Sequence, residues 1–350
     1  MNDFVDAAQL AALARDLPKV DLHRHLEGSI RVETLIDVAL TYDLTLPATD
    51  VEGLRPHVQI MPGDPRSWEH FLSKFSVLRM FFISPEVIMR VTREAVEDAA
   101  RDNIRYLELR FTPRALCNVI SCAFTDAVGW VCYAAQEASR DFGIEVRLIL
   151  SMNRHEGLIL GEKVLRAAVD HQAHGVVAID LAGREPEYPA EPFAGLFREA
   201  AASGLGITVH AGEWGSAKNV REAVERLGAT RIGHGVRSIG DSTVVQMLAE
   251  RGVTLELCPT SNIQSGVVAD MPTHPIADLY YSRIATTINT DDPLISNITL
   301  SAEIAAILTH TPLTLADVKK QILNGVRASF LPPHERDQLI AQFENVLLTL

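Results

Sequence analysis

The sequence predicts an α/β fold, a (β/α)8 TIM-type barrel with a helical insertion after its first strand. Eight short apolar runs rich in β-branched residues predict strands, and between them lie segments whose apolar residues recur three and four positions apart. Strands that alternate with helices pair in parallel. Histidines and acidic residues stand at the carboxyl ends of these runs, which meet at one mouth in a closed barrel. An open doubly wound sheet is the alternative, because periodicity does not show closure.

The predicted strands are spread over most of the chain. They are KVDLH (19–23), RYLELRF (105–111), EVRLILSM (145–152), VVAIDLAG (176–183), GITVHAGE (206–213), TRIGHGV (230–236), VTLELCP (253–259) and IATTINTDD (284–292). Helices are predicted between them, for example at 84–103 and 219–228, and closing helices at 315–348. Eight such units in a chain of 350 residues favour one barrel domain spanning residues 1–350.

The longest gap between predicted strands spans residues 29–104. It holds a helical stretch at 31–44, a stretch with Pro and Gly at 54–68 and a second helical stretch at 69–82. Long insertions in barrels tend to be functional, so we expect this segment to be helical and to cover part of the mouth as a lid. A small separate domain is the alternative, although no linker-like composition or charge run delimits one.

The charge balance argues against nucleic acid as a partner. The formal net charge is -13, whereas a surface that holds phosphate backbones needs clustered Lys and Arg. No run reaches the roughly 18 apolar residues that span a bilayer, so no membrane partner is expected. The start, MNDFVDAAQLAALARDLPK, carries early acids and lacks the basic and then apolar pattern of a secretory signal.

The cysteines show no C-x-x-C pair and no spacing of a zinc knuckle or a disulfide framework. They are Cys117, Cys122, Cys132 and Cys258. We expect buried thiols in a reducing compartment, and we place the protein in the cytoplasm.

Two histidines stand one residue apart in VDLHRHLEG, at the end of the first apolar run. Side chains at alternate positions of a strand point to one face, so His23, His25 and Glu27 can aim at one point. A strand end that faces water is the ordinary interpretation of such a pair alone. A metal site is favoured by His210 and Asp291 at the ends of later strands, because catalytic zinc takes His and acidic ligands and keeps a position for water.

Other metal schemes match the sequence less well. RHEGLIL lacks the second histidine of H-E-x-x-H, and the P-C-x-x-C part of the zinc nucleobase deaminase signature is absent. The fourth predicted strand, VVAIDLAG, has no Lys that would bridge a pair of metal ions. One Zn²⁺ per chain is therefore the simplest expectation.

Further titratable groups fall beside these candidate ligands. Glu213 lies three residues after His210 in VHAGEWG, His234 lies in RIGHGV, and Asp292 follows Asp291. A metal-bound water of lowered pKa needs a base to take its proton and an acid to protonate the group that it attacks. The set contains candidates for both, with helix capping by Glu213 and a plain backbone hydrogen bond of His234 as the structural alternatives.

The motifs VDLHRHLEG, VVAIDLAG, TVHAGEWGS, RIGHGVRSI, ELCPTSN and NTDDPLI follow in this order, with SFLP near the carboxyl terminus. In this order the chain resembles the adenosine deaminase family of metal-dependent amidohydrolases over nearly its whole length. The resemblance implies a (β/α)8 barrel with one Zn²⁺ bound by the residues matching His23, His25, His210 and Asp291.

The resemblance also implies roles for the residues around the metal. Glu213 matches the proton donor to the purine N1, and His234 matches the residue that orients or deprotonates the zinc-bound water. Asp292 matches the partner of N7, and Gly183 matches the backbone N–H that meets N3. His25 is expected among the substrate-binding residues as well as among the metal ligands.

One position departs from the pattern of the animal members of the family. Glu27 stands where they have Asp, as in several bacterial relatives and in neighbouring deaminases of adenine or aminodeoxyfutalosine, and in the family this position bonds the ribose. We expect hydrolytic deamination of a purine nucleoside, adenosine or deoxyadenosine, by a zinc-activated water. Adenine, aminodeoxyfutalosine and other 5′-modified adenosines are the alternative substrates. A catalytically silent purine-binding protein is the alternative from another class.

Overall fold

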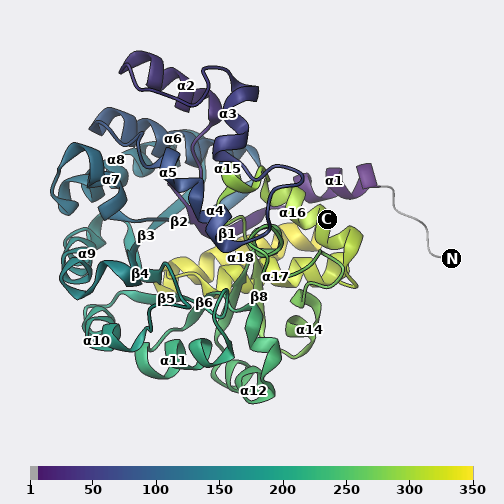
Figure 1. Cartoon of the computed structure of the whole chain (residues 1–350). Helices are drawn as coiled ribbons and strands as arrows, with labels where there is room; N and C mark the ends of the chain where they lie inside the picture. The colour runs from purple at the N-terminus through teal and green to yellow at the C-terminus, as the bar shows by residue number, and fades with distance from the viewer. Residues whose placement is uncertain (1–6, 350) are drawn as a thin grey trace.

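Eight parallel strands form the centre of the molecule (Figure 1). The computed structural model describes residues 7–349. The strands are β1 (Lys19–His25), β2 (Ile104–Phe111), β3 (Glu145–Asn153), β4 (Val176–Ala182), β5 (Gly206–Ala211), β6 (Arg231–His234), β7 (Thr254–Leu257) and β8 (Ala285–Ile288). Each strand pairs in parallel with the next one along the chain. Every predicted strand is therefore present.

The barrel closes between β1 and the segment that follows β8. The backbone N–H of His25 donates to the carbonyl of Asp291 at 2.8 Å, and the N–H of Asp291 donates to the carbonyl of His23 at 2.8 Å. Arg24 and Asp291 form a parallel bridge there. The predicted barrel is confirmed, and the alternative prediction of an open sheet is wrong. Closure also places the ends of β1 and β8 side by side, where predicted site residues stand.

Helices surround the strands and cover their outer faces (Figure 1). They are α1 (Ala7–Asp16), α2 (Val32–Thr41), α3 (Val51–Val58), α4 (Trp68–Ser73), α5 (Phe75–Leu78), α6 (Pro85–Arg101), α7 (Pro113–Ile120), α8 (Phe124–Phe142), α9 (Leu158–Asp170), α10 (Ala194–Ala202), α11 (Ala217–Leu227), α12 (Ser242–Arg251), α13 (Pro259–Gln264), α14 (Ile276–Tyr281), α15 (Pro293–Ser296), α16 (Leu300–His310), α17 (Leu315–Ala328) and α18 (Pro333–Thr349). Local sequence explains their starts: at α6, Ser84 accepts a hydrogen bond from the Val87 N–H and Pro85 occupies the first turn.

The segment between β1 and β2 forms the helices α2 to α6. The helix α6 buries an apolar stripe that includes Val91 and Ala95, as expected of a helix packed on a barrel. The lid role of residues 29–104 stays a prediction, and so does the single domain over residues 1–350. Residues 1–6 and 350 lie outside the described part of the chain. The prediction that the chain does not start with a secretory signal falls partly on these residues.

Four buried charged side chains pair inside the barrel. Arg231 forms ion pairs with Glu108 at 2.6 Å and with Glu256 at 2.6 Å, and Arg110 forms one with Glu256 at 2.7 Å. Each of the four is at most 1% exposed, so their mutual pairing must offset the desolvation of every charge. The network reaches the mouth, because Glu256 also contacts Nδ1 of His23 at 2.8 Å.

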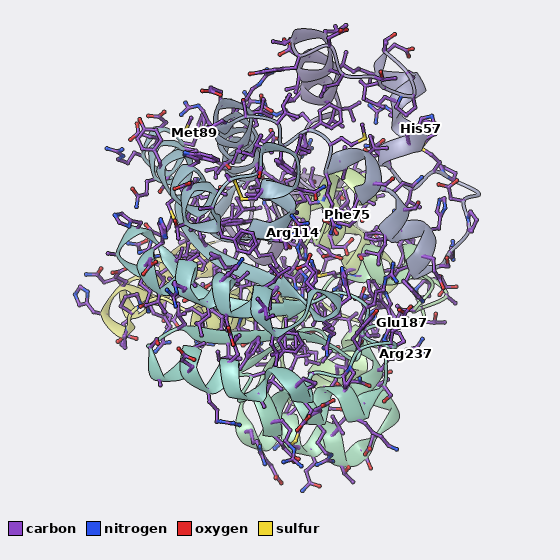
Figure 2. All side chains as sticks on the ribbon, turned by 60° about the vertical axis from the view of Figure 1, so that its left-hand side comes forward. His57, Phe75, Met89, Arg114, Glu187 and Arg237 are labelled. Atoms are coloured by element: carbon purple, nitrogen blue, oxygen red, sulfur yellow. A yellow bond between two sulfur atoms is a disulfide. The ribbon has the colours of Figure 1, made fainter. Side chains whose placement is uncertain are left out.

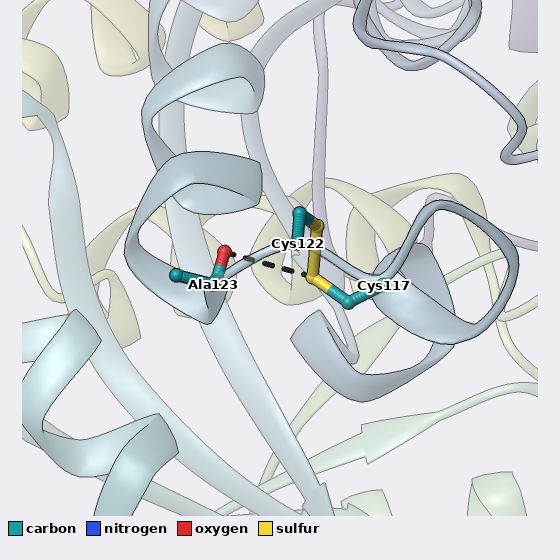
Figure 3. The surroundings of a disulfide bond; sticks show 3 residues. All are labelled: Cys117, Cys122 and Ala123. Atoms are coloured by element: carbon teal, nitrogen blue, oxygen red, sulfur yellow. Dashed lines mark hydrogen bonds between the residues drawn. A yellow bond between two sulfur atoms is a disulfide. The ribbon is translucent and has the colours of Figure 1, made fainter.

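The expectation of buried thiols is wrong for half of the cysteines. Cys117, near the end of α7, and Cys122, just before α8, form a disulfide (Figure 3). The chain turns back at Ser121, which adopts a left-handed conformation with φ of 46°, and this turn brings the two Cα atoms to 5.1 Å. Local spacing gave no signal for this pairing. Cys132 and Cys258 are buried free thiols, as expected.

Within residues 7–349, no single helix is both long and apolar enough to cross a membrane. The helices α7 and α8 pass that test only as a pair, and the chain bends by 109° between them. Seven residues of α8, from Ala127 to Ala138, are buried in this structure.

Candidate active site

The predicted metal ligands come together at the mouth of the barrel. Nε2 of His23 lies 3.3 Å from Oδ1 of Asp291, and Nε2 of His25 lies 3.4 Å from the same oxygen. Nε2 of His25 also lies 3.3 Å from Nε2 of His210. His23 and His25 lie at the end of β1, His210 lies near the end of β5, and Asp291 lies in the segment after β8. These positions come together only because the barrel closes.

His234 belongs to the same cluster. One ligand atom from each of His23, His210, His234 and Asp291 lies within 4.8 Å of the others. His234 and Asp291 adopt left-handed backbone conformations with φ of 58° and 61°. Such a conformation costs a non-glycine residue about 1–2 kcal/mol, so the surrounding barrel must hold both residues there.

Carboxylates outside the cluster orient two of the imidazole rings. Nδ1 of His23 lies 2.8 Å from Oε2 of Glu256, and Nδ1 of His210 lies 2.9 Å from Oδ1 of Asp180. A ring that donates its Nδ1–H to a carboxylate presents an Nε2 lone pair to the cluster. Sequence reasoning gave no role to Asp180 in VVAIDLAG, and it missed Glu256, although an acidic residue inside the apolar run VTLELCP is a usable signal.

The electrostatics of the cluster favour the neutral form for three of its imidazoles. The exception is His23, where burial lowers the pKa but the contacts with Asp291 and Glu256 outweigh burial and raise it. Burial lowers the pKa of His25, His210 and His234. Burial raises the pKa of Asp291, but its contacts with His23, His234 and His25 outweigh burial and hold that pKa well below its usual range. Neutral imidazole and ionised carboxylate are the forms that bind metal ions.

Glu213 is held at the edge of the cluster by another buried carboxylate. Glu185 accepts backbone N–H bonds from Gly212, Glu213, Trp214 and Gly215 at 2.6, 3.1, 3.1 and 3.0 Å. The loop wraps closely, since a Cβ at Gly215 would lie 2.7 Å from the Glu185 carboxylate. Sequence reasoning missed Glu185, which had no motif of its own.

The carboxyl group of Glu213 faces His234, with 3.6 Å between Oε2 and Nε2. Burial raises the pKa of Glu213 well above its usual value, and the negative charges of Asp291, Glu185 and Asp292 add to the effect. Burial and these charges therefore favour the protonated form of Glu213, which is the form that can give up a proton.

A narrow cavity of about 70 Å³ opens onto the cluster. The α4 and α5 segments contribute Phe71, Leu72, Phe75 and Arg79 to its wall, and Phe75 is labelled in Figure 2. Within the described chain, several buried polar atoms of the lining residues have no protein partner: Glu27 Oε2, Arg79 Nε, Asn153 Nδ2, Trp214 Nε1 and Asp292 Oδ1. Such atoms are the natural contacts of a polar ligand.

The remaining predicted binding residues also line this cavity. Glu27 accepts the Thr112 N–H at 2.9 Å through Oε1, and burial raises the pKa of Glu27. Burial raises the pKa of Asp292 well above its usual value, and the charges of Asp291 and Glu27 add to the effect. Gly183 has φ of 91°, a left-handed conformation that favours glycine.

A (β/α)8 barrel with imidazoles and carboxylates gathered at its mouth defines the amidohydrolase class of enzymes. Within that class, the model of the adenosine deaminase family matches residues 18–346. An adenosine deaminase of Serratia proteamaculans is 38% identical over 323 residues, which cover 92% of this chain and 97% of the relative. The chain belongs to the adenosine deaminase family and is a deaminase, as the sequence predicts.

Solved structures agree with this assignment. An adenine deaminase from Arthrobacter aurescens superposes with a TM-score of 0.87 at 25% identity, over 95% of this chain and 99% of that chain. An amidohydrolase from Burkholderia ambifaria with bound Zn superposes with a TM-score of 0.85 at 26% identity, over 100% of this chain and 97% of that chain.

Proposed function

We propose that this deaminase converts adenosine and deoxyadenosine to the 6-oxo nucleosides and ammonia, with one zinc ion in the histidine cluster. The observation that carries the proposal is the pairing of the buried Glu213 carboxyl group with His234, 3.6 Å apart at the edge of the cluster. Burial favours the protonated form of this carboxyl group. Hydrolysis of a 6-aminopurine needs a proton donor for the ring and a positioned water, and Glu213 and His234 offer one group for each role.

The residues present fit a zinc ion bound by His23, His25, His210 and Asp291. Nε2 of His23 is buried and has no hydrogen-bond partner among the described residues, while its Nδ1 is engaged by Glu256. Nitrogen and carboxylate oxygen ligands are those that zinc takes in catalytic sites. When bound, the ion supplies a water molecule of lowered pKa.

Ring recognition follows from matching donors to acceptors. The purine nitrogens N1, N3 and N7 of adenosine are all acceptors. Protonated Glu213 offers a donor to N1, protonated Asp292 offers one to N7, and the backbone N–H of Gly183 offers one to N3. This agreement supports a neutral 6-aminopurine as the substrate.

The reaction balances with water as the only co-reactant. Glu213 gives its proton to N1, which makes C6 electrophilic, and His234 orients the water whose oxygen bonds to C6. The C6–N6 bond then breaks, and the amino group leaves as ammonia with one of the two protons that the water brought. The other proton of the water returns to Glu213, and N1 keeps the proton that it received, which gives the 6-oxo product. Closure of the cavity by α4 and α5, as a lid, would exclude bulk water from these steps.

The sugar side sets the choice among substrates. Glu27 Oε2 is free to accept a hydrogen bond from a ribose hydroxyl, which favours a nucleoside over adenine. Adenine, aminodeoxyfutalosine and other 5′-modified adenosines are the competing substrates, and a small-molecule purine is the expected partner in each case. The cytoplasmic location stays a prediction.

A panel of these purines, followed by ultraviolet absorbance near the adenine band, tests the proposal. We expect loss of adenine absorbance with adenosine and deoxyadenosine, and weaker or no loss with adenine. Turnover of adenine alone would reassign the substrate. A protein that binds purines without any absorbance change would be the catalytically silent alternative.

A further inference from the structure

His274 and Asn262 form a buried hydrogen-bonded chain behind His234. Neither residue lines the cavity, and both belong to the region between β7 and β8. His274 is 4% exposed, Asn262 0% and His234 1%, so their contacts are those of the protein interior. A buried chain of this kind has a defined donor and acceptor at every link.

A backbone N–H, which can only donate, stands at one end of this hydrogen-bonded chain. The N–H of Ile276 donates to Nδ1 of His274 at 3.1 Å, so this nitrogen carries a lone pair. Burial lowers the pKa of His274 to about 3, so the ring is neutral at working pH. A neutral imidazole has one ring proton, and in His274 it must sit on Nε2.

The proton on His274 decides the orientation of the Asn262 amide. Nε2 of His274 lies 3.2 Å from Oδ1 of Asn262, which accepts this proton in a hydrogen bond. The reversed amide would set an NH2 group against the His274 N–H. The Nδ2 group of Asn262 therefore faces His234, 3.0 Å from its Nδ1.

We infer that His274 and Asn262 are positioning residues that keep a lone pair on Nδ1 of His234 and so leave its ring proton on Nε2, where His234 meets the reacting atoms as a hydrogen-bond donor. Nε2 of His234 faces acceptors, Oε2 of Glu213 at 3.6 Å and Oδ2 of Asp291 at 3.9 Å. This arrangement gives His234 a different role from the proposed metal ligands beside it. A nitrogen that carries a proton has no lone pair to give to a metal ion.

Two other rings of the cluster, those of His23 and His210, have the opposite arrangement. Nδ1 of His23 and Nδ1 of His210 face carboxylates. A carboxylate accepts a hydrogen bond from Nδ1–H, and this tautomer leaves a lone pair on Nε2. Nδ1 of His234 faces an amide NH2 group, which donates. For these three rings, the partner at Nδ1 thus determines whether the histidine is suited to be a ligand or a donor.

The direct test is the tautomer of His234, read by ¹⁵N NMR of metal-free protein labelled at histidine, with the His234 signal assigned by its loss in His234→Gln. We expect the proton on Nε2 in the wild type. Asn262→Asp replaces the donor behind His234 with an acceptor and should move the proton to Nδ1. His274→Gln keeps an N–H donor near Nε2 and should preserve the tautomer, whereas His274→Leu should lose it.

The kinetic test rests on the proposed deamination. We expect Asn262→Asp and His274→Leu to lower kcat by about 10- to 100-fold, the usual effect of removing a partner behind a site residue, with smaller changes in KM and in zinc content. His274→Gln should restore kcat. Asn324→Asp is the matched control, because among residues 7–349 that side-chain amide hydrogen-bonds only to the Thr286 carbonyl, at 3.3 Å, near the amino end of β8.

A wild-type His234 with its proton on Nδ1 would overturn the inference, and so would an unchanged tautomer in Asn262→Asp. A kcat loss that follows only the loss of folded protein or zinc, and that recurs in Asn324→Asp, would reduce both residues to structural support. If wild-type enzyme deaminates no purine, the proposed function fails, and the tautomer still decides this inference by itself.

Discussion

The indole rings of Trp68 and Trp214 stack with their centroids 5.6 Å apart and their planes at 28°. Trp68 begins α4 in the segment between β1 and β2, and Trp214 follows Glu213 in the loop after β5. The stack therefore joins the predicted lid to the loop that carries the proposed acid. Both rings are partly buried, so part of their contact is open to solvent.

Trp68→Ala should weaken closure of the cavity. An aromatic pair contributes about 0.5–1.5 kcal/mol beyond its buried area, which corresponds to a rise in KM for adenosine of about 2- to 10-fold. Trp68→Phe should retain much of the stacking and most of the affinity. Steady-state kinetics on both variants would check this, and equal losses in the two would show that the stack does not close the site.

Removal of the metal should abolish activity. We expect about one zinc ion per chain, released by chelation or by acid, because protonated histidines do not bind zinc. Alanine at His23, His25, His210 or Asp291 should empty the site, and His234→Ala should keep it filled. Metal analysis of the purified variants decides the matter: two ions per chain, full activity without metal, or loss of zinc from His234→Ala would each refute the assignment.

Glu213→Gln should lower kcat by about 10² to 10⁴, the range for loss of a general acid, because the amide has no proton to give to N1. Its zinc content should stay near normal. Glu187→Gln, at an exposed acid two residues after Glu185, is the control and should behave as wild type. A Glu213→Gln enzyme that loses zinc but keeps its turnover per bound metal would mean that Glu213 has another role.

Glu27→Gln should weaken adenosine binding by about 1–3 kcal/mol, because a sugar hydroxyl would lose its charged or acidic partner. The amide oxygen can still accept the Thr112 N–H, so the loop should hold. The loss should appear in KM more than in kcat, and adenine, which has no sugar, should be unaffected. Kinetics on adenosine, deoxyadenosine, a 5′-modified adenosine and adenine would measure it, and equal losses on all of them would assign Glu27 to loop support.

Glu303 should make stability depend on pH. Burial raises its pKa from 4.5 to about 7, against the opposing hydrogen bonds from Thr260. The folded state thus holds the proton more tightly, so this stabilising contribution is complete below pH 4.5 and is lost as the pH rises through 7.

Glu303→Gln removes this titration and keeps an oxygen for the Thr260 N–H. Its free energy of unfolding should exceed that of the wild type by about 1–3 kcal/mol at pH 8, and the difference should shrink towards pH 4.5. Denaturant unfolding at several pH values measures it. A difference that stays constant over that range would mean that the carboxyl does not titrate there.

The strands and the ligand candidates were readable from the sequence because their signals are local. An apolar run such as VVAIDLAG has the composition of a buried parallel strand whatever its neighbours are, and His23 and His25 share a face because side chains alternate along a strand. His210 and Asp291 also stand at predicted strand ends. To predict that they meet His23 and His25, we needed only the assumption that the barrel closes.

The tertiary structure decided what stands behind each of these residues. Glu185 binds the loop of Glu213 from 27 to 30 positions away along the chain, and Asn262 lies 28 positions from the His234 ring that it contacts. No periodicity links such positions, since strand and helix patterns repeat over a few residues only. The pairing of Cys117 with Cys122 depended in the same way on a turn with no recognised motif. Sequence alone thus determined which chemical groups reach the mouth of the barrel, and tertiary contacts determined which of them donate, which accept and which can bind a metal ion, because a protonation state is set by the partner that folding supplies.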